Sequence, residues 1–385
     1  MSAPFSVYVH VPFCASRCGY CDFNTYTAQE LSRDGTSITQ ANYAETLATE
    51  IKMASKQLGP RPISTIFFGG GTPTLLAPTA IKSTLLLLEQ EFGLLDDIEI
   101  TTEANPESVT RESLDKLRAS GVNRISFGMQ SAVPHVLSML ERTHSPERLV
   151  CAVHEAKDAG FEHISVDLIY GTPSESMADW RRSIDAALEL PIDHISAYSL
   201  IVEDGTKFAK KVQRGEVAMP DDDLTADKYL MAAEVFEAVG LAWYEVSNWA
   251  RSGGECRHNL AYWGDADWWG FGPGAHSHLA DQRWWNVKHP AAYAQRLEAG
   301  ELPIQDRERL TTVQREVERI MLNIRIRNGL PISSLPFVAA RQALDDGYLD
   351  AASFQSGQAV LTLKGRLMAD AVVRSLIDDL PTDED

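Results

Sequence analysis

Three of the five cysteines lie within eight residues near the start of the chain, at Cys14, Cys18 and Cys21. Closely spaced cysteine thiolates are typical ligands of iron–sulfur clusters. Three ligands are one fewer than a closed four-cysteine site requires, so a [4Fe-4S] cluster held here would keep one iron open to a small molecule. The spacing therefore predicts a cluster that also binds a ligand.

Three other interpretations of this cysteine trio were weighed. A zinc site would need a fourth ligand, such as His10 or Asp22, but structural zinc generally uses two separated cysteine pairs. Disulfides are disfavoured because five cysteines in 385 residues are few and odd in number. A chance grouping of inert cysteines is the third interpretation. The motifs that surround the trio favour the cluster.

The composition is that of an acidic globular protein. The chain is 44% hydrophobic and has a formal net charge of -19, with an acidic stretch over residues 378–385. A field of this sign repels polyphosphates, so nucleic acid is not expected as a partner. The sequence shows no secretory signal and no apolar run of the roughly 18 residues that span a bilayer. We expect a soluble, cytoplasmic protein, in which thiols stay reduced.

The first half of the chain alternates between strand and helix patterns. Short apolar, β-branched segments predict six strands, at 6–11, 63–68, 98–102, 124–127, 164–169 and 195–200. Helical patterns lie between them, near 41–57, 77–91, 111–119, 146–158 and 176–189. This alternation predicts an α/β fold with a parallel sheet, open or curled into part of a barrel.

Each predicted strand is followed by residues that could do chemistry. In strand order these are the cysteines, the glycines at 69–71, Glu103 with Asn105, Gly128 with Gln130, Asp167 with Tyr170, and Tyr198 with Ser199. Functional residues of parallel α/β sheets lie beyond the carboxyl ends of the strands. We therefore expect all of these motifs at one edge of the sheet.

The alternation stops near residue 203, which divides the chain into three expected regions. Residues 1–203 form the barrel, residues 204–306 a connecting region, and residues 307–385 a mostly helical, winged-helix-like module. The connecting region is rich in tryptophan, since seven of the eight tryptophans lie at 243–285, and it contains a glycine-rich stretch at 270–276 that we expect to be scaffold. In the last region, residues 361–365 predict a strand and a turn, and docking or substrate covering is expected rather than DNA binding.

Two of the motifs suit parts of a nucleoside that carries an amino acid. The glycines at 69–71 let the backbone approach a ligand, and exposed carbonyls there would accept from an ammonium group. Glu103 could accept hydrogen bonds from a ribose diol, as acidic residues do in nucleotide sites. Taken alone, each motif could equally be a sharp turn or a solvated carboxylate.

Together the motifs resemble those of the radical S-adenosylmethionine (SAM) superfamily, and more narrowly the oxygen-independent coproporphyrinogen III oxidase group. The matching runs are Tyr8-x-His10-x-Pro-Phe-Cys14-x3-Cys18-x-Tyr-Cys21, Gly-Gly-Gly-Thr-Pro and Glu-x-Asn-Pro. The resemblance implies a partial (β/α)6 barrel, a [4Fe-4S] cluster on the three cysteines, and SAM on the open iron. It assigns SAM contacts to Tyr8, Tyr20, Gly70, Gly71, Thr72, Glu103, Gln130, Arg142 and Asp167. Arg142 also has an independent rationale, because its planar fork suits a carboxylate.

Two departures distinguish the branches of this group. The decarboxylating oxidase carries a fourth cysteine two residues after the third, together with a long N-terminal extension. This chain has Phe23 at that position, and seven residues precede Tyr8. Both departures indicate the other branch, the HemW haem chaperones. The loop at 171–175, Gly-Thr-Pro-Ser-Glu, departs from the Gly-Leu-Pro-Gly-Gln of that branch.

A second motif supports the chaperone branch. His258-Asn-Leu-Ala-Tyr-Trp matches its haem motif, which implies haem contacts for His258, Asn259, Tyr262 and Trp263. A neutral imidazole is a common axial haem ligand, and Tyr262 would follow it at i+4 on one helix face. An isolated histidine of this kind would instead be expected to pack locally. Cys256 is an alternative thiolate ligand, and Cys151 is expected to be a buried helix residue.

The resemblance thus implies a haem chaperone that holds a [4Fe-4S] cluster, SAM and haem, and delivers haem to respiratory haemoproteins. The alternative is the enzyme itself, which converts coproporphyrinogen III to protoporphyrinogen IX with a 5′-deoxyadenosyl radical. A structural iron–sulfur protein without SAM conflicts with the motifs at the strand ends. The resemblance also implies dimerisation on cluster binding and transient contact with a membrane-associated partner.

Overall fold

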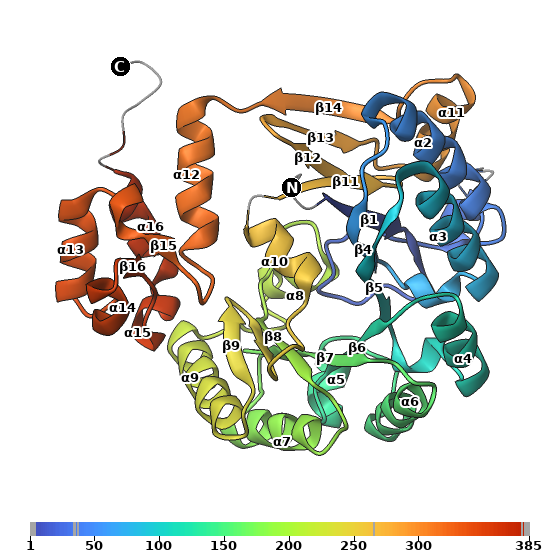
Figure 1. Ribbon diagram of the computed structural model, residues 1–385. Helices are drawn as coiled ribbons and strands as arrows, with labels where there is room; N and C mark the ends of the chain where they lie inside the picture. Colours follow the sequence, from blue (N-terminus) through green and yellow to red (C-terminus); the bar gives the residue numbers. More distant parts are fainter. Residues whose placement is uncertain (1–4, 34–35, 37, 265, 379, 381–385) are drawn as a thin grey trace.

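The computed structural model describes residues 5–33, 36, 38–264, 266–378 and 380 (Figure 1). Within these residues one twelve-stranded sheet has the order β14-β13-β12-β11-β1-β4-β5-β6-β7-β8-β10-β9. Its centre is six adjacent parallel strands, β1 (Phe5–Val11), β4 (Ile63–Gly70), β5 (Leu94–Ala104), β6 (Arg124–Gln130), β7 (His163–Tyr170) and β8 (His194–Ser199). These correspond to the six strands that the sequence predicts, so the α/β class is confirmed.

Helices connect the parallel strands and cover the outer face of the sheet (Figure 1). The main ones are α2 (Tyr43–Leu58), α3 (Pro78–Phe92), α4 (Arg111–Ala119), α6 (Pro146–Asp158) and α7 (Met177–Leu188), with shorter turns at α5 (Pro134–Met139), η1 (Pro73–Leu75) and η2 (Pro106–Ser108). Capping fixes several starts: Thr110 and Ser176 accept hydrogen bonds from first-turn N–H groups of α4 and α7. All seven residues of β6, near the middle of the parallel strands, are buried.

Six further strands, which the sequence did not predict, extend the sheet at both edges. Antiparallel strands β10 (Asn248–Ala250) and β9 (Ala242–Glu245) follow β8. At the other edge β11 (Asp267–Phe271) pairs in parallel with β1, followed by β12 (His276–Leu279), β13 (Gln282–Asn286) and β14 (Ile304–Arg309). One continuous core contains side chains from Phe5 to Leu297. The sheet and its core therefore continue well past residue 203.

The remaining elements of this part connect or close the sheet. They are β2 (Phe13–Cys14), β3 (Tyr26–Thr27), α1 (Ala28–Arg33), α8 (Lys207–Gln213), α9 (Asp222–Ala238), α10 (Arg257–Trp263) and α11 (Pro290–Glu298). The parallel pair of β2 and β3 closes the base of the segment that carries the cysteines. In Figure 1, α10 lies inside the curve of the strands.

The C-terminal region is mostly helical and has its own core. It comprises α12 (Thr312–Asn323), β15 (Leu330–Pro331), η3 (Ile332–Ser334), α13 (Phe337–Asp345), α14 (Ala351–Gln355), β16 (Gln358–Ala359), α15 (Leu363–Leu367) and α16 (Ala369–Ile377). The prediction of a strand at 361–365 is wrong, because Leu361 makes only an isolated β-bridge and Thr362 caps α15. Most of the acidic stretch at 378–385 lies outside the described residues. None of the described helices is long and apolar enough to cross a membrane.

Candidate functional site

The motifs that follow the parallel strands meet in one cavity of about 560 Å³. The three cysteines of the trio line it, as does every expected SAM contact except Tyr8. Asn105, Tyr198 and Ser199, which also follow predicted strands, belong to the same lining. The expectation of a single functional edge is therefore confirmed for these residues, because the carboxyl ends of parallel strands meet there.

The cysteine loop, residues 14–25, passes directly over the glycine turn that follows β4. Gly71 N–H donates to the Val11 carbonyl at 2.8 Å, and Thr72 N–H donates to the Phe13 carbonyl at 2.7 Å. A Cβ on Gly71 would lie 2.4 Å from the Phe13 oxygen and 3.0 Å from Cys14 Sγ. A side chain at position 71 would therefore push the first cysteine out of place.

Arg142 connects the cysteine loop to the next strand ends. Its Nη1 donates to Cys18 Sγ at 3.4 Å, while Nη2 donates to Asn105 Oδ1 at 2.6 Å and to the Gly128 carbonyl at 3.1 Å. Asn105 in turn donates to Thr72 Oγ1 at 2.9 Å. The guanidinium thus places a positive charge beside the Cys18 thiol.

Gln130 has the backbone strain that is common at binding sites. Its backbone φ is 61°, in the left-handed region that residues other than glycine rarely adopt, and the residue is buried. A Cβ on Gly128 would lie 2.8 Å from Gln130 Nε2 and 3.2 Å from Arg142 Nη2. The glycine therefore lets both side chains converge on the cavity.

Two carboxyls face the cavity rather than bulk water. Burial raises the pKa of Glu103 to about 8, with a further increase from the nearby Asp167, and Glu103 accepts from Gly70 N–H at 3.1 Å. Burial also raises the pKa of Asp167 to about 6, against the opposing effect of hydrogen bonds from Ser196 and Ser126. Two neighbouring carboxyls of this kind could hydrogen-bond the two hydroxyls of a ribose diol.

We expect Glu103→Gln to stabilise the ligand-free protein at alkaline pH. The raised pKa means that folded Glu103 keeps a proton that the unfolded chain releases, so the free energy of unfolding falls as pH rises from about 4.5 to about 8. Glutamine stays neutral and lacks this penalty. Melting temperatures at pH 5 and pH 8 test this: the advantage of the variant should grow with pH, whereas the exposed Glu112→Gln should show no such growth. An equal melting temperature at pH 8 would contradict the expectation.

Tyr8, the expected SAM contact outside the lining, bonds to His10. The pKa of His10 falls to about 4 because of burial, so the ring is neutral. Its Nε2 must carry the proton, since it bonds the Asn24 carbonyl at 2.8 Å and a carbonyl only accepts. His10 Nδ1 therefore accepts from the Tyr8 hydroxyl at 3.0 Å. These bonds occupy both nitrogens of His10, which was weighed as a zinc ligand.

The helix α10, which carries the haem motif, closes the inner end of the cavity. Asn259 and Cys256 line the cavity, whereas His258 is only 1% exposed and stacks on Phe67, another lining residue. The i+4 contact is present: His258 Nε2 and the Tyr262 hydroxyl are 2.9 Å apart. Trp263 belongs to the same helix, and its carbonyl accepts from Asn323 at 3.0 Å.

The second nitrogen of His258 defines the tautomer. Thr65 Oγ1 donates to Ser6 Oγ at 2.9 Å and lies 2.8 Å from His258 Nδ1, so Nδ1 carries the proton that Thr65 accepts. Nε2 then accepts from Tyr262. The pKa of His258 falls to about 3 because of burial, which keeps the ring neutral.

The two cysteines outside the trio differ in surroundings. Cys256 is buried, and burial raises the pKa of its thiol, which lies 3.6 Å from Glu99 Oε1. Cys151 is exposed, so the expectation that it is buried was wrong. The buried face of α6 consists of Leu149, Ala152, Val153 and Ala156, and position 151 points away from that face.

A polar interior below the strand ends was not predicted. Ser126 donates to Asp167 at 3.0 Å and lies 2.8 Å from Ser165, which lies 3.0 Å from His194 Nδ1. His194 Nε2 in turn lies 2.7 Å from the Tyr244 hydroxyl. The sequence does carry a signal for this interior, because polar residues alternate with apolar ones along β6, β7 and β8 and face inward. The strand prediction relies on the apolar residues and does not use this pattern.

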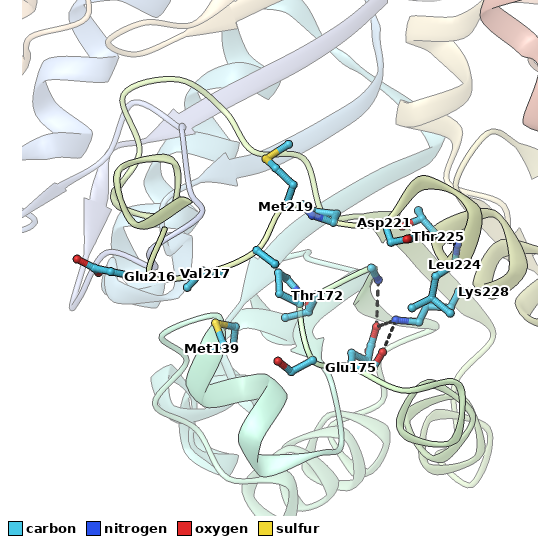
Figure 2. Close-up of a pocket in the computed structure, with 15 residues that line it drawn as sticks. Met139, Thr172, Glu175, Glu216, Val217, Met219, Asp221, Leu224, Thr225 and Lys228 are labelled. Atoms are coloured by element: carbon cyan, nitrogen blue, oxygen red, sulfur yellow. Dashed lines mark hydrogen bonds and ion pairs between the residues drawn. The ribbon is translucent and has the colours of Figure 1, made fainter. Parts of the chain in front are cut away.

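A smaller cavity of about 240 Å³ lies beside the loop that follows β7 (Figure 2). Its wall includes Met139 and Met219, and Figure 2 shows Glu175 and Lys228 meeting at one side of it. Lys228 Nζ donates to Glu175 Oε2 at 2.7 Å and to the Glu175 carbonyl at 2.8 Å. Both side chains are fully buried. The departure of the 171–175 loop from the family pattern is thus accommodated by a buried ion pair.

The donor set fits an iron–sulfur cluster in three respects. The three thiols of the trio are free, they line one cavity, and the cation of Arg142 lies beside one of them. Among the described residues, no three His, Cys, Asp or Glu side chains form a group that could hold a metal ion. Support for the cluster therefore comes from the three free thiols and their shared cavity edge, and not from a preformed metal site.

Comparison with known proteins agrees with this geometry. Residues 8–187 match the model of the radical SAM superfamily. The chain is 47% identical over 377 residues to the heme chaperone HemW of Mycobacterium tuberculosis (97% of this chain, 95% of the relative) and 35% identical over 326 residues to that of Bacillus subtilis (84% of each).

A solved structure shows the same fold. Coproporphyrinogen III oxidase (HemN) from Escherichia coli superposes with a TM-score of 0.83, covering 98% of this chain and 91% of the oxidase, at 22% identity. At that identity the likeness concerns the fold alone, and it includes the sheet extensions and the C-terminal helices. Both sequence relatives are HemW proteins that match more than four fifths of the chain, and the chain therefore belongs to the HemW family of the radical SAM superfamily.

Proposed function

We propose that this protein is a haem chaperone that binds a [4Fe-4S] cluster, SAM and haem, and passes haem to respiratory haemoproteins. The observation that carries the proposal is the 47% identity, over nearly the whole chain, to a protein named as a heme chaperone. The cavity supports it, because the cysteine trio and the expected SAM contacts line the same space. Phe23 supports it as well, since the enzyme branch has a cysteine at that position.

The cluster is assigned to Cys14, Cys18 and Cys21, and it would offer its open iron to the amino and carboxylate groups of SAM. The protein's own part is to orient and shield. Arg142 holds Cys18 and Asn105 together. Glu103 and Asp167 would accept from the ribose hydroxyls, and the glycine turn lets the ligand approach the backbone.

The haem site is proposed at α10. His258 Nδ1 is oriented by Thr65, as the second nitrogen of a metal-binding imidazole usually is by a neighbouring acceptor. Its Nε2 lone pair is occupied only by the hydroxyl of Tyr262, from the same motif. Displacement of that hydroxyl would free the lone pair for iron. Because His258 is buried, haem access requires α10 to move or Phe67 to turn aside.

A haem titration beside an activity assay tests the proposal. Anaerobically reconstituted protein should bind haem with a Soret band that weakens in His258→Ala, and it should not convert coproporphyrinogen III. The exposed His135→Ala variant is the control. Appreciable turnover of coproporphyrinogen would assign the protein to the enzyme instead. A full Soret band with a lowered melting temperature in His258→Ala would reassign that residue to packing.

The clients and the assembly of the chaperone are a separate part of the proposal, with their own test. We propose respiratory haemoproteins as clients, a membrane-associated partner for delivery, and a homodimer that forms on cluster binding. Sedimentation of the apo and reconstituted protein tests the dimer, and transfer of bound haem to an apo-respiratory complex in vesicles tests delivery.

A further inference from the structure

Asn24 attaches the far end of the cysteine loop to a distant part of the sheet. Its Nδ2 donates to the carbonyls of Pro273 at 2.9 Å and Lys288 at 2.8 Å, and its Oδ1 accepts from the Tyr26 hydroxyl at 3.1 Å. Both amide protons are thus used. The loop is thereby attached to the β11–β13 extension, 249 and 264 residues away in the sequence.

Few other bonds hold this loop. The Gly19 carbonyl accepts from Phe208 N–H at 2.8 Å, and Cys18 Sγ accepts from Arg142. Both of these attachments lie before Cys21. Beyond Cys21, Asn24 bonds the extension through its side chain and His10 through its carbonyl, and the Tyr26 hydroxyl adds a longer bond to the Lys288 carbonyl at 3.4 Å. The position of the third cysteine therefore depends on this residue.

The glycine-rich stretch at 270–276 provides the space for this contact. Gly274 has φ 75°, and a Cβ there would lie 2.7 Å from Asn24 Nδ2. Gly272 has φ 100°, and a Cβ there would lie 2.6 Å from the His10 carbonyl. Glycine is needed at both positions for conformation and for close approach. The stretch is expected from the sequence to be scaffold, and in the structure the cysteine loop packs against it.

Asn24 is also bonded toward the SAM side of the cavity. Its carbonyl accepts from His10 Nε2, and His10 Nδ1 accepts from Tyr8. The His10 ring fills the space beside Gly70, where a Cβ would lie 2.5 Å from the ring. Asn24 therefore relates the cysteine loop to Tyr8 and Gly70, two of the expected SAM contacts.

We propose that Asn24 is a positioning residue, which sets the cysteine loop against the SAM contacts by docking it on Gly274 and the two carbonyls of the extension. The inference rests on the proposed cluster at the cysteine trio. Asn24 is not itself a cluster ligand in this scheme. Its effect is on how firmly the cluster is retained and on how SAM meets it.

The first test approaches the contact from the extension. Gly274→Ala places a methyl group against Asn24, and Gly300→Ala is the matched control, because Gly300 has the same φ of 75° with nothing within 4 Å of its Cβ. Both variants carry the same backbone strain. We expect chelator to strip the cluster about tenfold faster from Gly274→Ala than from Gly300→Ala, as the weakening of the two hydrogen bonds from Asn24 Nδ2 implies. Equal rates in the two variants would overturn the proposal.

The second test removes the two donors without changing shape. Asn24→Asp keeps the Oδ1 acceptor and places an anionic oxygen against two carbonyls. Asn123→Asp is its control, since Asn123, just before β6, also bonds the backbone: its Nδ2 donates to the Ile98 carbonyl and its Oδ1 accepts from Ile100 N–H, each at 2.8 Å. We expect Asn24→Asp to lose the cluster as Gly274→Ala does, and any retained cluster to show a weaker SAM-induced change in its EPR spectrum.

The results of these two tests distinguish the positioning role of Asn24 from the proposed function of the protein. Equal cluster loss in Asn24→Asp and Asn123→Asp at equal loss of melting temperature would mean general destabilisation and would overturn the positioning role. A wild-type EPR response to SAM in Asn24→Asp would overturn it as well. Failure of the wild-type chain to take up any cluster would refute the proposed function, and the positioning role with it.

Discussion

Cys18→Ala is expected to emerge from anaerobic reconstitution without a [4Fe-4S] cluster. The cysteine trio supplies three ligands at the cavity edge, so loss of one leaves two ligands for four irons. Cys18 is also the thiol that accepts from Arg142, which would be left without that partner. Iron and sulfide content, the visible absorbance and the EPR spectrum after reduction measure the effect.

Cys151→Ala is the control for this experiment, because Cys151 is exposed on α6 and lies outside the cavity lining. It should keep the full cluster content of the wild-type chain. A cluster retained in full by Cys18→Ala would refute the ligand assignment. It would direct attention to Cys256, the other thiol that lines the cavity.

Lys228→Met is expected to have the largest effect on stability. It would leave Glu175 buried without its cation, and breaking a buried pair in this way costs about 3–5 kcal/mol. The pKa of Glu175 is already raised by burial, against the effect of Lys228, so protonation would relieve part of the cost and the penalty should shrink at acidic pH. Chemical denaturation at pH 7 and pH 5 measures both effects.

A double-mutant cycle separates charge from packing at this site. Glu175→Gln together with Lys228→Met removes both charges while keeping similar volumes, so we expect it to recover most of the stability lost in Lys228→Met. The glutamine would resemble the family's usual residue at position 175. A loss below about 1 kcal/mol in Lys228→Met, as surface pairs give, would contradict the expectation.

The central part of the fold could be predicted because its signals are local. Each of the six parallel strands is a short apolar run, and each ends in residues unsuited to a core, which is why both the strand order along the chain and the shared edge were recovered. The added strands are only three to six residues long. The pairing of β11 with β1 joins residues about 260 positions apart, and no local pattern records it.

The candidate site divides in the same way. The cysteine trio, Glu103 and Asp167 follow strands and were found, whereas Asn24 was not, since its partners Pro273 and Lys288 lie in another part of the sequence. The burial of His258 was not predicted either. The motif gives only the spacing of its own side chains. The burial of His258 depends on its contacts with Phe67 and Thr65, which come from β4.

The attachment of Asn24 to the extension also has a consequence during synthesis of the chain. Ribosomes add about 5–20 residues per second, so the cysteine loop is made roughly 10–50 s before residue 273, to which it docks 249 positions later. During that interval the three thiols lack their final support and are open to oxidation or to the wrong metal. We therefore expect the proposed cluster to be inserted after translation of the extension, and any cellular factor that guards nascent thiols would have to act before it.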